Sequence, residues 1–588
     1  MATQGAAREV EMTQEEVDGE IHRIFDGESD ESEFEGFDVG SSEDDDSDLQ
    51  GSDEDDEEQP RVWNWRTVTA DNDTADASAW LPGVTRQRGP TAQADENISP
   101  ADCFAMMFTD EVVDIAVTQT NLYAQRKLEA LGAHFPSSRM RKWHDISSRE
   151  MKVFFVLLLA MSIVEQPALA DHWTTDWLYQ TPGFAKVMSR NRFQLILSCL
   201  HFVDNTTIEY DEHGRYRDPL AKIRKFLDII VKRFRLSYYP KKDVSVDEQM
   251  IAYKGRLSFK QYMPAKPTKW GVKAFVLAEP GTGYIYEWTL YTGKDMAEGR
   301  DVAMADTSKG SQIVAKLVRH LGQGHVVYMD NYYSSPTLFQ WLSSRRGMGA
   351  VGTVRVNRKG LPPACKDKKK KGTPPRFWRD ETVLTCSWPD KKQVTVLSTI
   401  HSCEVVDVDI RDRRAPQGVR SVKKPSCIAS YNSLMGGVDE ADQMLSYYAF
   451  PHRHRRWYLI LFHQLLEISV HNAKIIYNAM TGKNLDGKEF HKALIASLFT
   501  ETQWPIGEPR RRSVPATTDD VDTARLTERH FCTQLAVEGK RDCVVCSRRP
   551  DHRKQTSWQC VQCVRMMCPG ECFQRFHTLH DYRVRYAD

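Results

Sequence analysis

The sequence has no apolar run long enough to cross a membrane. Its most apolar stretch, residues 153–161, is about half as long as the ~20 residues that a membrane helix needs. The first residues also lack a basic start followed by an apolar segment, so we expect no signal peptide. These absences argue against a membrane or secreted protein. Residues 153–161 are better interpreted as part of a buried helix.

Cysteine is scarce outside one short segment. Six of the 13 Cys fall between Cys543 and Cys572, and the others are scattered singly. A secreted disulfide framework would spread its Cys more evenly. The distribution therefore favours a reducing compartment and a local metal site.

Basic residues are nearly missing from the first 60 positions, which hold 2 Lys or Arg against 24 Asp or Glu. Residues 1–98 are predicted to form a disordered acidic tail, because so polar a segment buries too little apolar surface to offset its ordering entropy. The rest of the chain carries 77 basic against 57 acidic residues, a net charge of +20. Such a body predicts a polyanionic partner. The tail either solubilises the chain or regulates that partner, and both interpretations stay open.

The length of 588 residues predicts several domains. Shifts in composition and periodicity give their boundaries. The predicted parts are the tail at 1–98, a helical segment at 99–240, a strand-rich segment at 241–355, a β-rich insertion at 356–424, a return to the core at 425–450, a second helical segment at 451–505, a linker at 506–541 and a Cys-rich segment at 542–588.

Three short acidic stretches organise the chain: residues 244–248, 326–331 and 435–442. Asp247 and Asp330 each follow a β-branched or aromatic run, which predicts two strands that finish with a carboxylate in a cleft. Asp439 and Asp442 follow a Gly-Gly pair, which predicts a turn into a helix whose first turn faces that cleft. Carboxylates gathered from distant segments are typical of a site for two divalent cations. We therefore expect two-metal phosphoryl transfer on DNA.

Residues 241–355 follow the order strand, hairpin, helix and strand, which is the order expected of an RNase H-like core. The connection after Asp247 is basic and aromatic, as expected where a DNA backbone runs. More cations open the helix predicted after residue 451, where they are unfavourable unless an anion such as DNA phosphate faces them. The DNA contacts predicted from these two segments are Lys254, Arg256, Lys260, Lys266, Lys269, Arg455 and Arg456.

The Cys-rich end has the spacing of a zinc module. Its four ligand pairs are Cys543 with Cys546, Cys560 with Cys563, Cys568 with Cys572, and His577 with His580. Eight thiolate and imidazole ligands suit two tetrahedral Zn²⁺ ions. We expect an interleaved cross-brace, with the first and third pairs on one ion and the second and fourth on the other. His552 is a possible substitute ligand, and Cys532 lies far upstream. On spacing alone, a RING- or PHD-like module that recruits ubiquitin machinery or reads histones stays open.

Taken together, the acidic stretches and the short motifs around them resemble the piggyBac family of DNA transposases. The matching motifs are residues 246–248, 254–256, 330–335 and 436–439, and the resemblance covers about residue 99 to the C-terminus. It implies a multidomain α/β protein with an RNase H-like catalytic core at 241–355 and 425–450, a β-rich insertion, and helical dimerisation and DNA-binding parts at 99–240 and 451–505. It also implies cut-and-paste transposition at TTAA targets through hairpinned ends.

The resemblance assigns roles to individual residues. Asp247, Asp330 and Asp439 would hold two Mg²⁺ ions, or Mn²⁺ in vitro, with Asp442 supporting or sharing the ligation. Arg355 and Arg358 match positions that contact target DNA, and Trp457 matches a tryptophan near the active site. The zinc module would bind the transposon end.

The partners implied are double-stranded DNA, namely the terminal repeats and the TTAA target, and a second copy in a homodimer, with no membrane. We expect a nuclear protein. The lysine run at 366–371 is a nuclear import signal, a phosphate clamp or a solvated loop. Two alternatives stay open: a domesticated DNA-binding protein without cleavage activity, and a chromatin or ubiquitin adaptor that acts through the zinc module.

Overall fold

The computed structural model divides into two compact units, one ending at Ile506 and one beginning at Gly507. It describes residues 61–73, 78–93, 95–131, 138–264, 266–293, 308–411, 413, 418–506, 530–535, 540–547, 553–579 and 582. Within these ranges, no helix combines the length and the apolar character that a membrane crossing requires.

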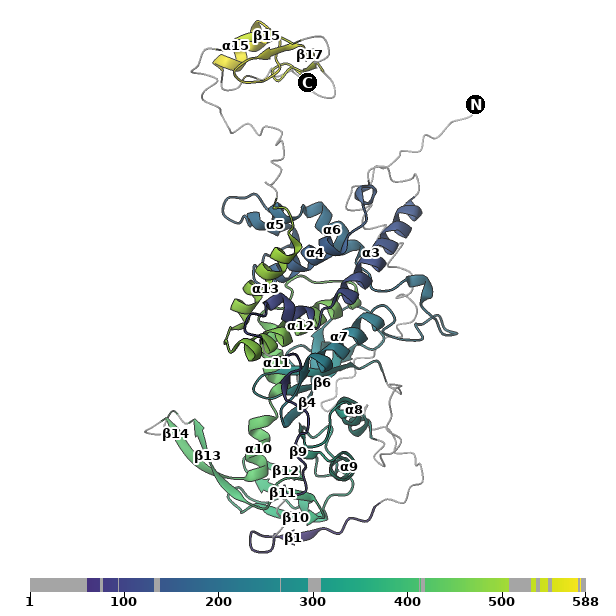
Figure 1. Cartoon of the computed structure of the whole chain (residues 1–588), viewed down its shortest axis with the longest axis vertical. Helices are drawn as coiled ribbons and strands as arrows, with labels where there is room; N and C mark the ends of the chain where they lie inside the picture. The colour runs from purple at the N-terminus through teal and green to yellow at the C-terminus, as the bar shows by residue number, and fades with distance from the viewer. Residues whose placement is uncertain are drawn as a thin grey trace, which may run out of the picture. The chain divides into compact units, whose positions relative to one another are not determined.

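A mixed ten-stranded sheet is the centre of the first unit (Figure 1). The strand order is β1-β10-β11-β12-β9-β8-β4-β6-β5, and β7 pairs with β6. Strand β8 runs parallel to both β4 and β9, whereas the other neighbours are antiparallel. The strands are β1 Arg66–Val68, β4 Asp243–Ala252, β5 Gln261–Tyr262, β6 Trp270–Glu279, β7 Tyr284–Leu290, β8 Val326–Met329, β9 Gly349–Thr353, β10 Arg376–Asp380, β11 Val383–Pro389 and β12 Gln393–Ser398.

The strand order predicted for residues 241–355 is present. Strands β6 and β7 form the expected hairpin, and Gly281 and Gly283 in its turn have the positive φ angles that favour glycine. Helix α8 (Lys309–Val318) follows the hairpin and leads to β8. Most residues of β6, β7 and β8 are buried, as expected of strands covered on both faces. Helix α9 (Pro336–Arg346) then connects β8 to β9.

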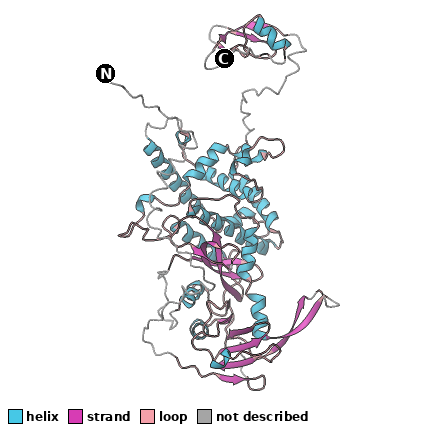
Figure 2. Cartoon of the chain, turned by 180° about the vertical axis from the view of Figure 1, so that it is seen from behind, coloured by secondary structure: helices cyan, strands magenta, loops and turns pink. Residues whose placement is uncertain are grey.

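The helices predicted at 99–240 and 451–505 form one layer (Figure 2). Helices α12 and α13 pack against α2, and α13 also packs against α4, so the two segments share a core. The apolar run at 153–161 lies buried in α4, whose N-terminus is capped by the Ser147 hydroxyl. The main helices of this layer are α2 Pro100–Ala105, α3 Asp110–Leu131, α4 Ser148–Met161, α5 Pro182–Val187, α6 Arg190–Cys199, α7 Arg224–Ser237, α12 Trp457–Thr481 and α13 Gly487–Thr502.

Residues 356–424 are rich in strands, and most of those strands extend the central sheet. Strand β12 pairs with β9, and β11 and β10 follow it outward. The remaining two strands, β13 (Val405–Arg411) and β14 (Val419–Pro425), form a separate ribbon. Helices α10 (Ser426–Leu434) and α11 (Gly437–Ser446) then lead back to the centre of the sheet.

Part of the segment predicted to be a disordered tail is ordered. Residues 66–68 form β1 and pair with β10, and β2 (Gly89–Pro90) pairs with β3 (Tyr238–Tyr239). The Trp65 and Trp80 indoles donate hydrogen bonds to the carbonyls of Gly360 and Thr399. The prediction was drawn from the most acidic part of the segment, whereas these aromatic side chains near its end supply the apolar contact that orders residues 61–73.

The second unit is small and held around its Cys residues. Two short antiparallel pairs, β15 (Cys532–Gln534) with β18 (Trp558–Cys560) and β16 (Arg541–Asp542) with β17 (Gln555–Thr556), precede helix α15 (Glu571–Thr578). Strand β15 lies within the predicted linker at 506–541. The folded part therefore includes residues upstream of 542.

Candidate functional site

Asp247 and Asp330 are brought together by parallel strand pairing. Val246 of β4 pairs with Met329 of β8, and the residue that follows each of them along the chain is one of the two acids. Asp247 was predicted to end its strand, but β4 continues to Ala252. The reason is that β6 pairs with β4 as far as Ala252, whereas the pairing with β8 ends at Val246.

Helix α11 brings the third acidic stretch to the same strand. A Cβ atom on Gly437 would lie 2.6 Å from the Ser245 Oγ atom and 2.9 Å from the Pro280 backbone nitrogen, so only glycine allows this approach. Asp439 lies exposed in the first turn of α11. Asp442, one turn later, is half-buried and accepts a hydrogen bond of 2.5 Å from Gln249 of β4.

The acids perturb one another. Burial, followed by the charges of Glu248 and Asp330, raises the pKa of Asp247 to about 8. Burial and Glu248 also raise the pKa of Asp330, and burial with the charge of Asp439 raises the pKa of Asp442 to about 6. Burial is the largest cause of each shift, and a neighbouring carboxylate adds to it. Strongly shifted acids beside one another are typical of a functional site.

Lys266 is a half-buried cation beside these acids. Its Nζ atom lies 3.7 Å from the Glu248 Oε1 atom and donates to the Glu248 carbonyl at 3.3 Å. Burial lowers its pKa, but the charges of Glu248, Asp247, Asp439 and Asp442 outweigh burial, and the pKa of Lys266 is raised overall. The ammonium group therefore stays charged and offsets part of the acidic cluster.

The donor set fits hard divalent cations by its chemistry. Carboxylate oxygens are the ligands such cations prefer, and Mg²⁺ often binds one or two carboxylates together with substrate phosphates. Across the described residues, the four Asp side chains do not form a set of three ligand atoms mutually within 4.8 Å. The fit therefore rests on donor type and charge.

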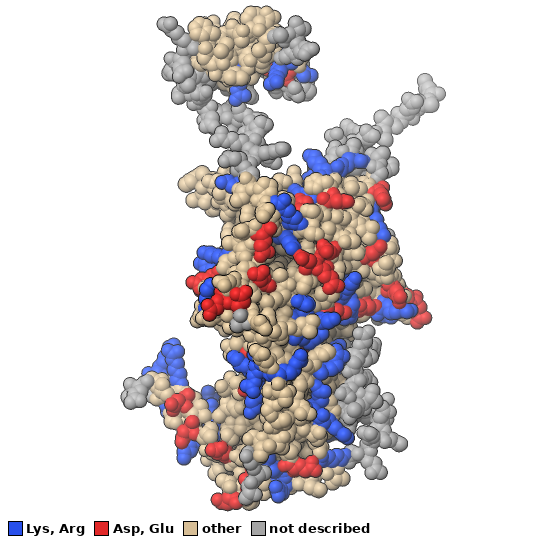
Figure 3. All heavy atoms as spheres, viewed as in Figure 1, with Lys and Arg blue, Asp and Glu red and all other residues tan. Residues whose placement is uncertain are grey.

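Exposed cations surround the connection between β4 and β6. Lys254, Arg256 and Lys269 are exposed, and Tyr262 and Trp270 present exposed rings 4.6 Å apart. Lys260 is half-buried and donates to the Gly255 carbonyl at 3.0 Å. Figure 3 shows Lys and Arg side chains gathered over this part of the first unit, with few acidic side chains among them.

The two arginines matched to target contacts hold the loop after Asp330. Arg355 Nε donates to the Asn331 side-chain oxygen at 3.0 Å. Arg358 donates to the carbonyls of Asn331 and Tyr332 at 2.9 Å each. These guanidinium groups link the backbone that follows Asp330 to the segment after β9.

The cations at the start of α12 lie in different surroundings. Arg455 is exposed, but Arg456 donates to the carbonyls of Leu197 and Ser198 near the C-terminus of α6. The anionic partner that the sequence analysis assigned to DNA is thus, for Arg456, the negative end of a helix. Trp457 is 4% exposed and packs edge-to-face on Phe259, so its ring contributes to the core.

The first and third Cys pairs lie together, as the interleaved arrangement predicts. The sulfur atoms of Cys543, Cys546, Cys568 and Cys572 lie within 4.8 Å of one another. Those of Cys546 and Cys568 are 3.9 Å apart. Zn–S bonds of about 2.3 Å place tetrahedral sulfurs roughly 3.8 Å apart, so this set fits a Zn²⁺ ion.

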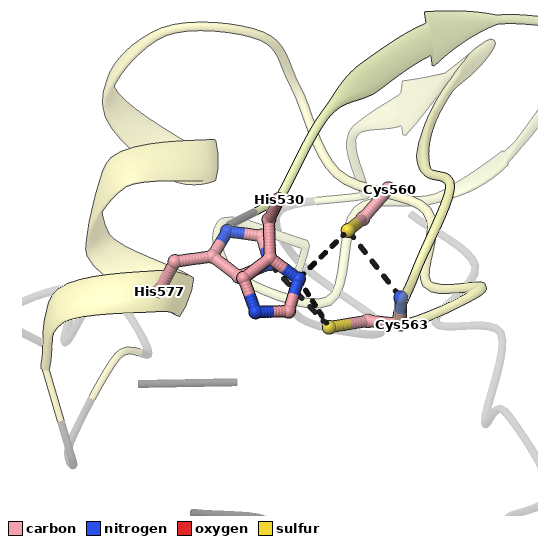
Figure 4. A group of neighbouring side chains, drawn as sticks. All are labelled: His530, Cys560, Cys563 and His577. Atoms are coloured by element: carbon pink, nitrogen blue, oxygen red, sulfur yellow. Dashed lines mark hydrogen bonds between the residues drawn. The ribbon is translucent and has the colours of Figure 1, made fainter. Parts of the chain in front are cut away.

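A second group contains a histidine that the sequence analysis missed (Figure 4). Cys560, Cys563 and His577 are joined by His530, whose Nδ1 atom lies 3.5 Å and 3.3 Å from the two sulfurs. His577 Nδ1 bonds the Phe573 carbonyl at 2.8 Å, which leaves Nε2 facing Cys563. The predicted ligand His580 and the substitute His552 lie outside the described residues.

His530 reaches the group through strand pairing. Cys532 of β15 pairs with Cys560 of β18, which carries the residues before β15 to the second Cys pair. A search by ligand spacing could not find it, because 30 residues separate His530 from Cys560.

Comparison with known proteins places this architecture in a family. A family model described as Transposase IS4 matches residues 99–474. PiggyBac transposable element-derived protein 3 of Homo sapiens is 26% identical over 493 residues, covering 82% of this chain and 76% of that protein. PiggyBac transposable element-derived protein 2 of Homo sapiens is 24% identical over 427 residues, covering 70% and 66%.

A solved structure shares the fold. The cryo-EM structure of a piggyBac transposase synaptic complex with hairpin DNA matches with a TM-score of 0.60 at 24% identity, over 82% of this chain and 98% of that chain. The predicted resemblance is thereby confirmed. Since the family model spans more than half of its length, the chain belongs to the piggyBac-type transposase family.

Proposed function

We propose that this protein is a cut-and-paste DNA transposase with an RNase H-like core, which excises and integrates an element at TTAA sites through hairpin ends. The observation that carries the proposal is the meeting of Asp247, Asp330 and the α11 acids beside β4. Family membership supports a DNA-cutting enzyme, and the solved relative is described as a complex with hairpin DNA.

Asp247, Asp330 and Asp439 would hold the divalent ions, with Asp442 in support. Bound Mg²⁺ or Mn²⁺ would activate the attacking water or 3′-OH and stabilise the leaving 3′ oxygen. Because its pKa is raised, Asp247 holds a proton that it must lose before it can bind a metal ion. Gln249 orients Asp442, and Lys266 limits the repulsion among the acids.

DNA would lie along the exposed cations beside the acids. Lys254, Arg256 and Lys269 are placed to contact phosphates, while Tyr262 and Trp270 offer rings for stacking. Arg355 and Arg358 would serve target DNA indirectly as well, because they fix the loop that follows Asp330. The proposal includes a homodimer on paired ends and a nuclear location.

The Cys-rich unit would carry two Zn²⁺ ions and contact the transposon end. Its two ligand groups would replace much of a hydrophobic core in so short a unit. Chelation is therefore expected to unfold this unit and to weaken binding to the ends.

The test is excision in cells of a marker flanked by candidate TTAA-bordered ends. Wild type is compared with Asp247→Ala, Asp330→Asn and the control Asp243→Asn, which changes an acid on the same strand outside the cluster. Seamless loss of the marker with wild type and the control only supports the proposal. Tight binding to the ends without excision would instead identify a domesticated DNA-binding protein.

A further inference from the structure

Cys532 lies on β15 outside both ligand groups of the second unit. Those groups contain the other six Cys residues that follow Gly507, so Cys532 is the thiol of this unit that is not assigned to a zinc ion. Cys532 is half-buried, whereas Cys560, a ligand of the second group, is buried. Small oxidants in solution therefore reach the Cys532 side chain more readily than the Cys560 side chain.

Strand pairing places Cys532 directly opposite Cys560. One residue further along, the Val561 N–H group donates to the Phe531 carbonyl at 2.9 Å. The Cys560 N–H group donates to the Arg565 carbonyl at 3.0 Å, so it is not used in the pairing with β15. The two cysteines thus form a non-hydrogen-bonded antiparallel pair, in which Cα atoms are about 4.5 Å apart and side chains lie closest. Disulfides join Cα atoms about 4.4–6.8 Å apart, so the backbone geometry suits one.

The two side chains also point to the same face. Residues directly across an antiparallel ladder share a face, and so do residues two apart on an extended chain. His530 lies two residues before Cys532, and its Nδ1 atom is 3.5 Å from the Cys560 sulfur (Figure 4). Cys532 therefore lies on the side of β15 that faces the second ligand group.

We propose that Cys532 and Cys560 form a reversible disulfide when the protein meets a peroxide, and that this bond expels the zinc ion of the second group. Peroxide converts the Cys532 thiol to a sulfenic acid and releases one water. The Cys560 thiolate leaves the metal and attacks the Cys532 sulfur, and the departing hydroxide takes up a proton to become a second water. The two sulfurs lose two electrons, which reduce the O–O bond.

The disulfide would leave three ligands for the ion, namely Cys563, His530 and His577. Structural zinc sites are closed by four ligands, so the ion would be held more weakly. Since bound zinc contributes folding energy in so small a unit, its loss would loosen the unit. The released ion is the one assigned to the second group in the proposed function, on which this step rests.

The oxidation is expected to be slow. Burial, followed by the charge of Cys560, raises the pKa of Cys532, so little of this thiol is ionised. Thiolates react with peroxide and thiols scarcely do, so the exposure must be long enough for the small ionised fraction to react. A disulfide between Cys560 and Cys563 within the ligand group is the competing product.

The test uses the zinc-loaded full chain, hydrogen peroxide and two variants that differ in where one thiol lies. Cys532→Ser removes the thiol. The matched variant, Cys532→Ser with Thr533→Cys, keeps the number of thiols but moves one to an exposed position on the opposite face of β15. Released zinc is followed with a chromogenic chelator. Linked cysteines are identified by peptide mass after the free thiols are blocked.

Wild type is expected to release about one of its two zinc ions and to yield a peptide pair linked through Cys532 and Cys560. Dithiothreitol with added zinc should restore both thiols and the lost ion. Both variants should keep two ions over the same exposure. Equal zinc loss in the three proteins would overturn the proposal. So would a main product linking Cys560 to Cys563, full recovery of Cys532 as a free thiol, or a linked protein that keeps both ions.

The zinc assignment and the disulfide fail separately. If the purified chain holds fewer than two ions but Cys532 and Cys560 still become linked, the second zinc site falls and the disulfide stands. Two bound ions without a linked pair have the opposite meaning. Zinc content before oxidation shows whether the unit of each variant is intact, which is expected because neither changed residue belongs to a ligand group.

Discussion

Gln249 on β4 holds Asp442 on α11 through a directed hydrogen bond. The Gln249 Nε2 group donates to the Asp442 Oδ1 atom at 2.5 Å, and the Gln249 Oε1 atom accepts from the Trp288 indole at 2.8 Å. Because an indole N–H can only donate, Trp288 fixes which end of the amide faces the acid.

Gln249→Glu is expected to lower strand cleavage about 10- to 100-fold while DNA affinity is retained, the usual effect of losing a group that orients a metal ligand. The new carboxylate still accepts from Trp288 but cannot donate to Asp442. The control is Gln443→Glu, at an exposed position on α11, the helix that carries Asp442. Equal cleavage by both variants would refute a positioning role for Gln249.

Asp247→Asn is expected to abolish cleavage when metal is present. In EDTA, without metal, the same change is expected to stabilise the protein. The folded-state pKa of Asp247, about 8, lies above its unfolded value near 3.8, so ionisation favours the unfolded chain as pH rises between them. The variant should therefore match wild type near pH 4 and exceed it by a few kcal/mol near pH 8, since each pKa unit corresponds to about 1.4 kcal/mol. Thermal unfolding across this range measures the difference, and a gap that shrinks with pH contradicts it.

His530→Ala is expected to reduce bound zinc from two ions per chain toward one, as His577→Ala should. Cys532→Ser, two residues away and outside both groups, is the control and should keep both ions. Zinc is measured by elemental analysis of purified protein. If His580→Ala loses an ion and His530→Ala does not, the fourth ligand of the second ion is His580, as the ligand spacing predicted.

Asp73→Ala is expected to destabilise the first unit by about 3–5 kcal/mol, because it leaves the buried Arg379 charge unpaired. Both side chains are 1% exposed and their atoms approach to 2.7 Å. Burial raises the pKa of Asp73, but the bonds from Arg379 outweigh burial and the net pKa is lowered. The stabilisation is therefore present above pH 3.8 and is lost in more acidic solution.

Denaturant unfolding measures the Asp73 effect, and Glu381→Gln is its control. Glu381 is 65% exposed in its pair with Arg61, and such pairs contribute little. If the two variants lost similar amounts of unfolding free energy, burial of the Asp73–Arg379 pair would be unimportant for stability.

Val564→Gly is expected to stabilise the zinc unit by about 1 kcal/mol. Val564 has a φ of 51°, which a β-branched residue adopts only under strain, and the residue is 68% exposed. The change therefore relieves backbone strain while losing little packing. Resistance to unfolding by a zinc chelator measures the gain, and Val561→Gly, at a neighbouring exposed position, should show none.

The parts that sequence could predict are those that depend on short-range pattern. Asp247 and Asp330 follow apolar runs, and a Gly-Gly pair precedes the helix that carries Asp439 and Asp442, so the sequence alone could predict that these acids meet. Strand pairing then sets what pattern cannot show. The continuation of β4 past Asp247 depends on β6, which lies in a later segment of the chain.

Contacts that depend on distant partners were the ones misjudged or missed. Arg456 was assigned to DNA because no local anion was visible, whereas the end of α6 lies some 260 residues earlier. His530 has no ligand at a recognisable spacing and reaches its site through β15. The order of residues 61–73 likewise depends on β10, which lies more than 300 residues away.

The ten-stranded sheet ends on one side in a very short strand, the three-residue β1. Exposed edges template pairing with other chains, and a short outermost strand limits that risk. Strand β1 thus protects β10, a five-residue strand that would otherwise form the edge. A version beginning after residue 68 would expose the β10 edge, and its solubility would fall although every acid of the cluster is retained.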